Sequence, residues 1–218
     1  MTLPDGARLV AVADGIGGQP AGDRASQWAM VILGNEIRRR CCFGSLVAPD
    51  LALNYEHLLG SAFKAAAESV HGAAECCVPL RGAGTTLTAA IIEPNGTIHI
   101  RHTGDSRAFI ASRGGVRPLT ADHGEGHRLH RWLGYMADPS EEGDAATAEL
   151  RPGELLILAS DGAHMGRSPE EQAEVLAGAF GPGGEPDPRK AVEALLERRG
   201  GDDATAAAVG MRGMAGDV

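Results

Sequence analysis

The sequence is poor in the features that mark membrane, secreted and aromatic-rich proteins. Aromatic residues make up 4% of the 218 positions, so a core must be built mainly from Ala, Val, Leu and Ile. No apolar run approaches the roughly 18 residues needed to cross a bilayer, and no secretory signal is recognisable. We therefore expect no membrane partner and a cytoplasmic location.

Cysteines and basic residues are also scarce. The four cysteines form two adjacent pairs, Cys41-Cys42 and Cys76-Cys77, and neither has the C-x-x-C spacing of a zinc or redox site. Reduced structural thiols are expected, with a bridge between the pairs left open by the sequence. The net charge of -9 argues against a nucleic-acid partner, because phosphate contacts need clustered cations and the only tight basic run is residues 38–40.

Four aspartates stand in similar surroundings along the chain. The apolar run of residues 10–13 is typical of a buried strand, and it ends at Asp14, which is followed by three glycines within four residues. Glycine lets the backbone approach a ligand closely, so we expect Asp14 at an exposed and well-defined position. Asp105, Asp161 and Asp202 occupy comparable places. An Asp beside a glycine often only begins a turn, but four of them favour the hypothesis that their carboxylates converge on metal ions.

Hydrophobic periodicity predicts helices before and after a group of strands. The expected helices cover residues 23–40, 50–74 (with Asp50 as N-cap), 127–133, 169–180 and 189–199. The expected strands cover residues 8–13, 85–92, 97–102, 107–112, 116–119, 146–150, 155–160 and 206–211. Short connections predict an antiparallel meander over 85–119 and a hairpin over 146–160. The pattern indicates a single α+β domain spanning residues 1–218.

The residues around the aspartates resemble the metal-dependent protein phosphatases of the PPM family, the type 2C serine/threonine phosphatases, in their bacterial form. The resemblance extends from Arg8 to Met211 and rests on five short segments, residues 13–18 (ADGIGG), 84–86 (GTT), 104–107 (GDSR), 160–162 (SDG) and 202–205 (DDAT). It implies a four-layer α-β-β-α sandwich, in which two antiparallel sheets are flanked by antiparallel helix pairs.

The resemblance also implies an activity, a cofactor and a set of site residues. The implied activity is that of a protein serine/threonine phosphatase, a hydrolase that cleaves phosphate monoesters with a water activated at a binuclear Mg²⁺ or Mn²⁺ centre. Asp14 would bridge the two ions, the Gly15 carbonyl would help ligate one, and Asp161 and Asp202 would ligate the other; Asp105 would lie near a third, weaker ion. Hard divalent cations relieve the repulsion among such carboxylates and lower the pKa of a shared water. A phosphorylated protein is the implied substrate, with a cognate kinase as a further candidate partner in signalling.

The start of the chain departs from the family pattern. Family members normally carry a preceding N-terminal strand, with an arginine that holds the phosphate and an acidic ligand of the second ion. The chain begins 13 residues before Asp14, and Asp5 and Arg8 lie too close to the first strand to be the counterparts. Either the start is truncated or misassigned, or part of the site is missing. Arg24 is a candidate to approach the phosphate, although an arginine on a helix face is usually solvated.

This departure leaves an alternative function open: a catalytically weak or inactive phosphatase-like scaffold that binds a phosphoprotein or a signalling partner. Two other positions also differ from some family members. Ile16 stands where some carry a histidine, and Met165 stands where the family often has an acidic residue that supports the third ion. The adjacent His164 is expected at the surface. His123, His127 and His130 are expected as polar positions on a short exposed helix rather than as metal ligands.

Overall fold

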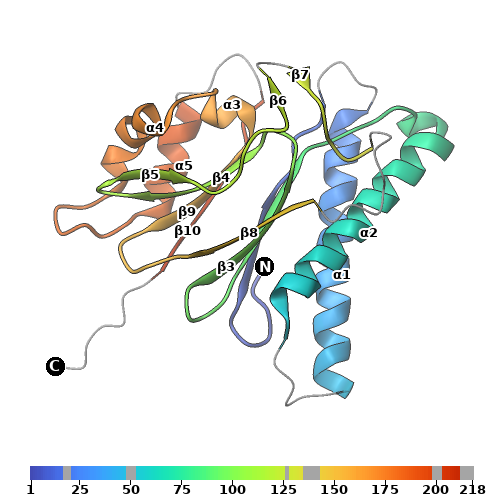
Figure 1. The fold of residues 1–218 in the computed structure, drawn as a ribbon, viewed down its shortest axis with the longest axis horizontal. Coiled ribbons are helices and arrows are strands. Elements are labelled where there is room, and N and C mark those ends of the chain that lie inside the picture. The colour runs from blue at the N-terminus through green and yellow to red at the C-terminus, as the bar shows by residue number, and fades with distance from the viewer. Residues whose placement is uncertain (17–20, 48–52, 126–127, 135–142, 198–202, 212–218) are drawn as a thin grey trace.

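The computed structural model describes residues 1–16, 21–47, 53–125, 128–134, 143–197 and 203–211, and it places two packed sheets between helices (Figure 1). Both sheets are antiparallel and four-stranded, with the orders β1-β2-β3-β8 and β10-β9-β4-β5. Their strands are β1 (Arg8–Val12), β2 (Leu87–Ile92), β3 (Thr97–Thr103), β4 (Arg107–Ser112), β5 (Gly115–Pro118), β8 (Asp144–Glu149), β9 (Leu155–Ala159) and β10 (Ala206–Gly210). Each strand predicted from the sequence is therefore present to within two residues at either end.

The helices form the two outer layers. Helices α1 (Gly22–Val47) and α2 (Tyr55–Cys76) cover the first sheet, while α4 (Pro169–Leu176) and α5 (Pro188–Glu197) cover the second (Figure 1). The shorter elements are α3 (Asp161–His164) and the 3-10 helices η1 (Val78–Leu80) and η2 (Ala177–Ala179). The predicted four-layer α-β-β-α sandwich is confirmed. None of the described helices is long and apolar enough to span a membrane.

Three apolar clusters separate the four layers. The first joins α1 and α2 to the outer face of the first sheet, and the third joins α4 and α5 to the outer face of the second. The middle cluster lies between the sheets and includes Ile100, Leu156 and Leu158. Because side chains alternate across a strand, Leu156 reaches the middle cluster while its neighbour Ile157 packs in the third. Strand β9 is thus buried on both faces, which explains its continuous apolar sequence.

Two of the predicted strand pairings are wrong. Strand β8 pairs with β3 in the first sheet, whereas β9 pairs with β4 and β10 in the second, so residues 146–160 do not form a hairpin. The predicted meander likewise divides into one hairpin in each sheet, β2-β3 and β4-β5. A short turn can join neighbouring strands or carry the chain between sheets stacked about 10 Å apart. Turn length alone therefore does not determine the partner of a strand.

The helix boundaries also differ from those predicted. Helix α2 begins at Tyr55 with Asn54 as its N-cap, whose side-chain oxygen accepts the His57 N–H at 2.9 Å, so the choice of Asp50 was wrong. Asn and Asp are equally good N-caps, and nothing local distinguished them. Asp50 itself lies outside the described residues. Helix α1 continues to Val47, seven residues beyond its predicted end at residue 40, and its Trp28 is 44% exposed.

Candidate metal centre

Four aspartates from separate strand ends line one cavity. Asp14 follows β1, Asp105 follows β3, Asp161 follows β9 and Asp203 precedes β10. Since the paired strands run antiparallel, these ends meet at the same end of the sandwich, where α3, β6 and β7 also lie (Figure 1). The cavity has a volume of about 430 Å³, and Gly15 is also part of its lining. The sequence-predicted residues Asp14, Gly15, Asp105 and Asp161 are therefore brought together, while Asp202 lies outside the described residues.

The backbone of Asp14 is held from both sides by two buried threonines. The Asp14 N–H donates to Thr86 Oγ1 at 3.0 Å, and the Asp14 carbonyl accepts from the Thr86 N–H and the Thr85 hydroxyl, both at 2.8 Å. Thr86 Oγ1 also shares a 2.7 Å hydrogen bond with the hydroxyl of Ser106, which is fully buried. These bonds fix the residue at which β1 ends, and they use Ser106 as a structural group.

The backbone on both sides of Asp105 is held by two histidines. His164 Nε2 donates to the Asp105 carbonyl at 2.9 Å, while its Nδ1 accepts the Gly166 N–H at 3.0 Å. On the other side, Gly104 N–H donates to His123 Nδ1 at 3.2 Å, and the His123 N–H donates to the Gly104 carbonyl at 2.8 Å. Gly104 has a φ of 106°, which a residue with a side chain rarely adopts. The expected surface position of His164 was wrong, because it is only 2% exposed and burial lowers its pKa.

Asp161 is the first residue of α3 and directly adjoins the segment that contains Asp203. A side chain at Gly162 would collide with the Asp203 carbonyl. Only glycine at this position lets the two segments lie so close together. The Asp161 carboxylate accepts the Gly162 N–H at 2.7 Å. Below the junction, Ser160 N–H donates to the Thr205 carbonyl at 2.9 Å, and Thr205 N–H donates to Ser160 Oγ at 3.0 Å.

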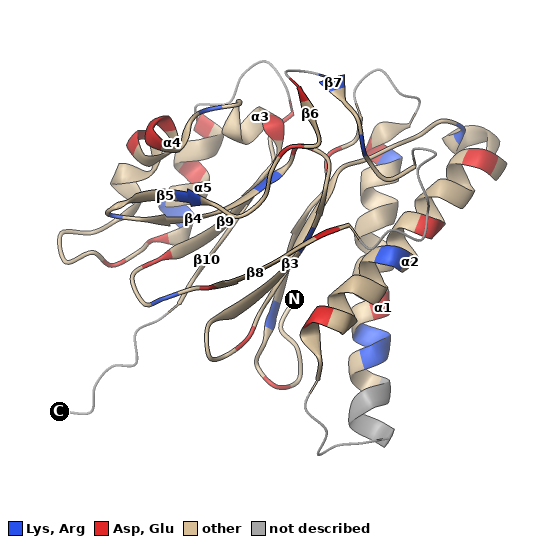
Figure 2. Ribbon diagram, viewed as in Figure 1, with Lys and Arg blue, Asp and Glu red and all other residues tan. Residues whose placement is uncertain are grey.

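The electrostatics of the cavity favour a bound cation. Burial raises the pKa of Asp105 to about 6, and the nearby Asp161 carboxylate contributes to the rise. Acidic segments also lie beside α3 and β6 in Figure 2. Within the described ranges, however, no group of three or more His, Cys, Asp or Glu side chains is arranged to hold a metal ion by itself.

A small hairpin that the sequence did not predict forms part of the cavity wall. Strands β6 (Gly124–Glu125) and β7 (Arg128–Leu129) replace the helix expected over residues 127–133. Arg128, Leu129 and Trp132 line the cavity beside the carboxylates. Their short, mixed sequence carries no periodic signal, so only the structure identifies them as cavity residues.

The three histidines expected on that helix have other surroundings. His123 precedes β6, and its Nε2 lies 2.9 Å from an Asp144 carboxylate oxygen, with its side chain 13% exposed. The backbone N–H of the exposed His130 donates to the His123 carbonyl. His127 lies outside the described residues. His123 is therefore a partner of the Asp105 loop rather than a polar residue on a helix.

A buried histidine lies behind the Asp105 loop. His102 is 1% exposed, and its Nε2 donates to the Ala121 carbonyl at 2.9 Å, while Nδ1 lies 2.9 Å from the Thr88 hydroxyl. Its ring packs against that of His123, with 4.8 Å between the ring centroids. Burial lowers the pKa of His102 to about 4, and the neighbouring His123 acts in the same direction. His102 is therefore neutral near pH 7.

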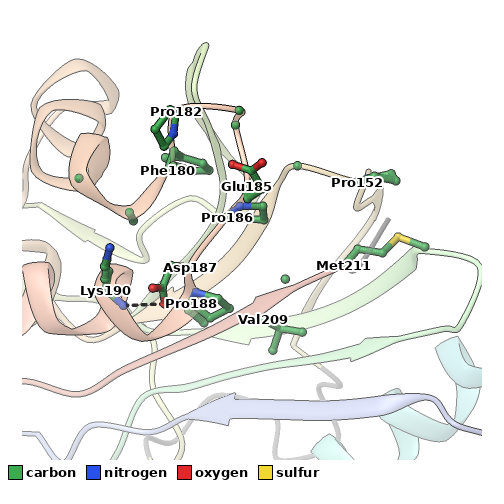
Figure 3. A pocket seen from close by; sticks show the side chains of 18 of the residues that line it. Pro152, Phe180, Pro182, Glu185, Pro186, Asp187, Pro188, Lys190, Val209 and Met211 are labelled. Atoms are coloured by element: carbon green, nitrogen blue, oxygen red, sulfur yellow. Dashed lines mark hydrogen bonds between the residues drawn. The ribbon is translucent and has the colours of Figure 1, made fainter. Parts of the chain in front are cut away.

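A second cavity, of about 1230 Å³, lies at the opposite end of the strands (Figure 3). It is formed where β1 begins and β10 ends, and residues 178–188 form one of its walls. Asp187 lies in this wall, and its carboxylate accepts backbone N–H groups at the start of α5, including that of Lys190. This cavity contains none of the aspartates at the metal-centre end.

Comparisons of sequence give the relationship of this chain to known proteins. The sequence pattern of the family described as Protein phosphatase 2C matches residues 1–197. The serine/threonine phosphatase stp of Listeria welshimeri is 34% identical over 127 residues, which are 58% of this chain and 48% of that protein. The serine/threonine protein phosphatase PstP of Mycobacterium tuberculosis is 30% identical over 194 residues, covering 78% of this chain and 34% of PstP. The chain thus spans about half or less of the length of these curated relatives.

Solved structures show the same fold. The catalytic domain of PstP, crystallised in complex with two manganese ions, superposes with a TM-score of 0.67 at 26% identity, over 93% of this chain and 88% of that one. The serine/threonine phosphatase of S. agalactiae superposes with a TM-score of 0.72 at 23% identity, over 95% of this chain and 88% of that one. By sequence and by fold, this chain belongs to the protein phosphatase 2C family.

Proposed function

We propose that this protein is a divalent-metal-dependent phosphatase that hydrolyses the phosphate monoesters of serine/threonine phosphoproteins. The observation that carries the proposal is the meeting of Asp14, Asp105, Asp161 and Asp203, from four separate strand ends, at one cavity. The names of the relatives from Listeria and Mycobacterium, and the two manganese ions in the PstP catalytic domain, support the same activity and cofactor.

The donor atoms at the cavity fit hard divalent cations such as Mg²⁺ or Mn²⁺. The proposed ligands are the carboxylates of Asp14, Asp161 and Asp202 and the Gly15 carbonyl, with Asp105 near a third, weaker ion. Magnesium keeps several of its waters and usually takes only one or two carboxylates from a protein. The proposed ions therefore do not each need three carboxylates, which agrees with the absence of such a group among the described residues. The pKa of Asp105 is raised mainly by burial and further by the nearby Asp161 carboxylate, and a bound cation would offset both effects.

The residues of the chain position the reactants and limit what can act as nucleophile. When bound, the ions would bind phosphate oxygens and make a water acidic enough to attack phosphorus near neutral pH. Thr85 and Thr86 hold the backbone of Asp14, which keeps its carboxylate in a fixed place. Ser106 is fully buried and hydrogen-bonded to Thr86, so it is no candidate nucleophile. Water therefore remains the attacking group in this proposal.

Hydrolysis of p-nitrophenyl phosphate with added MnCl₂ tests the proposal. The parent protein is expected to turn over only with the metal, and Asp14→Asn and Asp161→Asn are expected to lose most of this activity while remaining folded by circular dichroism. Asp187→Asn is the matched control, because Asp187 lines the distant cavity and Asn serves equally well at a helix start. Absence of turnover by the parent, or equal activity of Asp14→Asn, would contradict the proposal.

A further inference from the structure

We propose that Arg128 binds the phosphate group of the substrate. This inference rests on the proposed function and assigns a phosphate contact within the same cavity. Arg128 belongs to β7, and among the described residues that line the cavity it is the one that carries a positive charge. It is exposed, and within the described part of the chain no hydrogen bond or ion pair engages its guanidinium.

The other arginines near the metal-centre end are already used by the protein. Arg107 forms a bidentate ion pair with Asp122, with N–O distances of 2.8 and 2.7 Å. Arg131 donates to Asp144 at 2.6 Å, and Arg167 donates to the Ala163 carbonyl at 3.1 Å. None of these three lines the cavity. Arg128 therefore combines a place in the cavity with five N–H donors that can turn to a ligand.

The hairpin that carries Arg128 is anchored to the loop that holds Asp14. Thr85, whose hydroxyl binds the Asp14 carbonyl, exchanges two backbone hydrogen bonds with Leu133, at 3.0 and 2.9 Å. Trp132 packs so closely on Gly84 that a side chain there would lie 2.5 Å from the indole ring. At its other end the hairpin follows His123, which binds Gly104 beside Asp105. The position of Arg128 is thus tied to both aspartate loops.

A guanidinium suits the chemistry of the cavity, alongside the proposed metal ions. A phosphate monoester is close to a dianion at neutral pH, and it must enter a site built from several carboxylates. A guanidinium offers two parallel N–H donors to two phosphate oxygens, and it keeps its charge at any working pH. Such a contact would orient the ester and stabilise the charge on its oxygens during hydrolysis.

Arg24 is the rival for this role. It lies in the first turn of α1, after the loop that follows Asp14, and it is exposed. Arg24 is absent from the described lining of the cavity. The two arginines therefore make different predictions when each is replaced.

The test is the binding of inorganic phosphate to the Mn²⁺-loaded protein by titration calorimetry, together with a separate Mn²⁺ titration. We expect Arg128→Ala to weaken phosphate binding roughly 10- to 100-fold, the effect of losing charge-assisted hydrogen bonds. Arg128→Lys should recover part of the loss, because lysine keeps the charge but not the fork of donors. Mn²⁺ affinity should be unchanged or higher in Arg128→Ala, since a positive charge beside the carboxylates has gone. Arg24→Ala should bind phosphate as the parent does.

Three results would overturn the assignment of Arg128. They are parent-like phosphate binding by Arg128→Ala, loss of phosphate binding by Arg24→Ala, and a parallel loss of Mn²⁺ binding by Arg128→Ala, which would indicate a structural role. The proposed function fails separately, when the parent protein itself binds no Mn²⁺ and hydrolyses no aryl phosphate; that result overturns both proposals. A parent that binds Mn²⁺ and is active, with an Arg128→Ala variant that binds phosphate normally, overturns only the assignment of Arg128.

Discussion

Replacing Thr86 by valine should weaken both the fold and the metal centre. Valine has nearly the shape of threonine, but it lacks the hydroxyl that accepts the Asp14 N–H at 3.0 Å and contacts Ser106 Oγ at 2.7 Å. Thr86 is only 2% exposed, so water cannot readily replace the lost partner. The Asp14 N–H and the Ser106 hydroxyl would each lose a hydrogen bond close to the site.

The expected magnitude follows from the cost of an unsatisfied buried group. Leaving a buried donor without a partner costs about 1–3 kcal/mol, and we expect the free energy of unfolding of Thr86→Val to fall by that amount. Mn²⁺ affinity should fall about 10-fold, the lower end of the effect seen when a group that orients a metal ligand is removed. Urea unfolding of the metal-free protein measures the first quantity, and calorimetric titration with MnCl₂ measures the second.

Thr88→Val is the matched control for this experiment. Thr88 lies two residues further along the chain, within β2, is fully buried, and donates to the Ser106 carbonyl at 2.6 Å without contacting Asp14. It should lose similar stability and retain most of its Mn²⁺ affinity. Equal losses of Mn²⁺ affinity in the two variants, or no loss in Thr86→Val, would refute the idea that Thr86 supports the metal centre through Asp14.

Three further predictions concern stability alone. Burial holds the pKa of His102 at about 4, below the 6.5 of an unperturbed histidine. The unfolded state therefore takes up the proton first, and the free energy of unfolding falls as the pH drops from 6.5 to about 4. Between pH 7 and 4.5 the parent should lose about 2–3 kcal/mol more than His102→Gln in urea unfolding; parallel pH profiles would contradict this. Gly84→Ala should cost about 1–3 kcal/mol, because the new methyl group would lie 2.5 Å from the Trp132 ring. Gly72→Ala, in α2 with no atom within 4 Å of the new carbon, should instead raise the free energy of unfolding by about 0.5–1 kcal/mol. A change in the same direction in Gly84→Ala and Gly72→Ala would count against the packing argument. Ser168→Ala should cost about 1 kcal/mol by thermal or urea unfolding, because it removes the capping box that Ser168 and Glu171 form at the start of α4; an unchanged stability would show that the cap is unimportant.

The strands could be predicted from the sequence because their signal is local. Continuous apolar runs marked β2 and β9, and glycine and proline marked the turns between strands. The observed ends of these strands lie close to the predicted ones. The pairings β2-β3 and β4-β5 were predicted correctly. The partner of β8 could not be predicted, since the turn after β8 is equally compatible with a hairpin and with a change of sheet. The N-cap of α2 was misassigned for a similar reason, because Asn54 and Asp50 are both suitable residues.

The candidate site likewise contains residues that the sequence identifies and residues that only the structure reveals. Asp14, Asp105 and Asp161 could be identified because each stands beside glycine at the end of a strand, and the order of these segments resembles a known family. Arg128 and Trp132 could not be identified, because their place in the cavity depends on the docking of a non-periodic segment onto Thr85. His164 was expected at the surface because its neighbours in sequence do not reveal that α4 packs over it. Gln172 of α4 donates to the His164 carbonyl at 3.2 Å.

The central claim is that aspartates from separate strand ends form one binding site for divalent ions. Calorimetric titration of the metal-free protein with MnCl₂, beside Asp14→Asn and the control Asp187→Asn, tests it most directly. The account predicts saturable binding of two Mn²⁺ ions by the parent and by Asp187→Asn, and loss of that binding in Asp14→Asn. Failure of the parent to bind Mn²⁺, or identical binding by parent and Asp14→Asn, would contradict it.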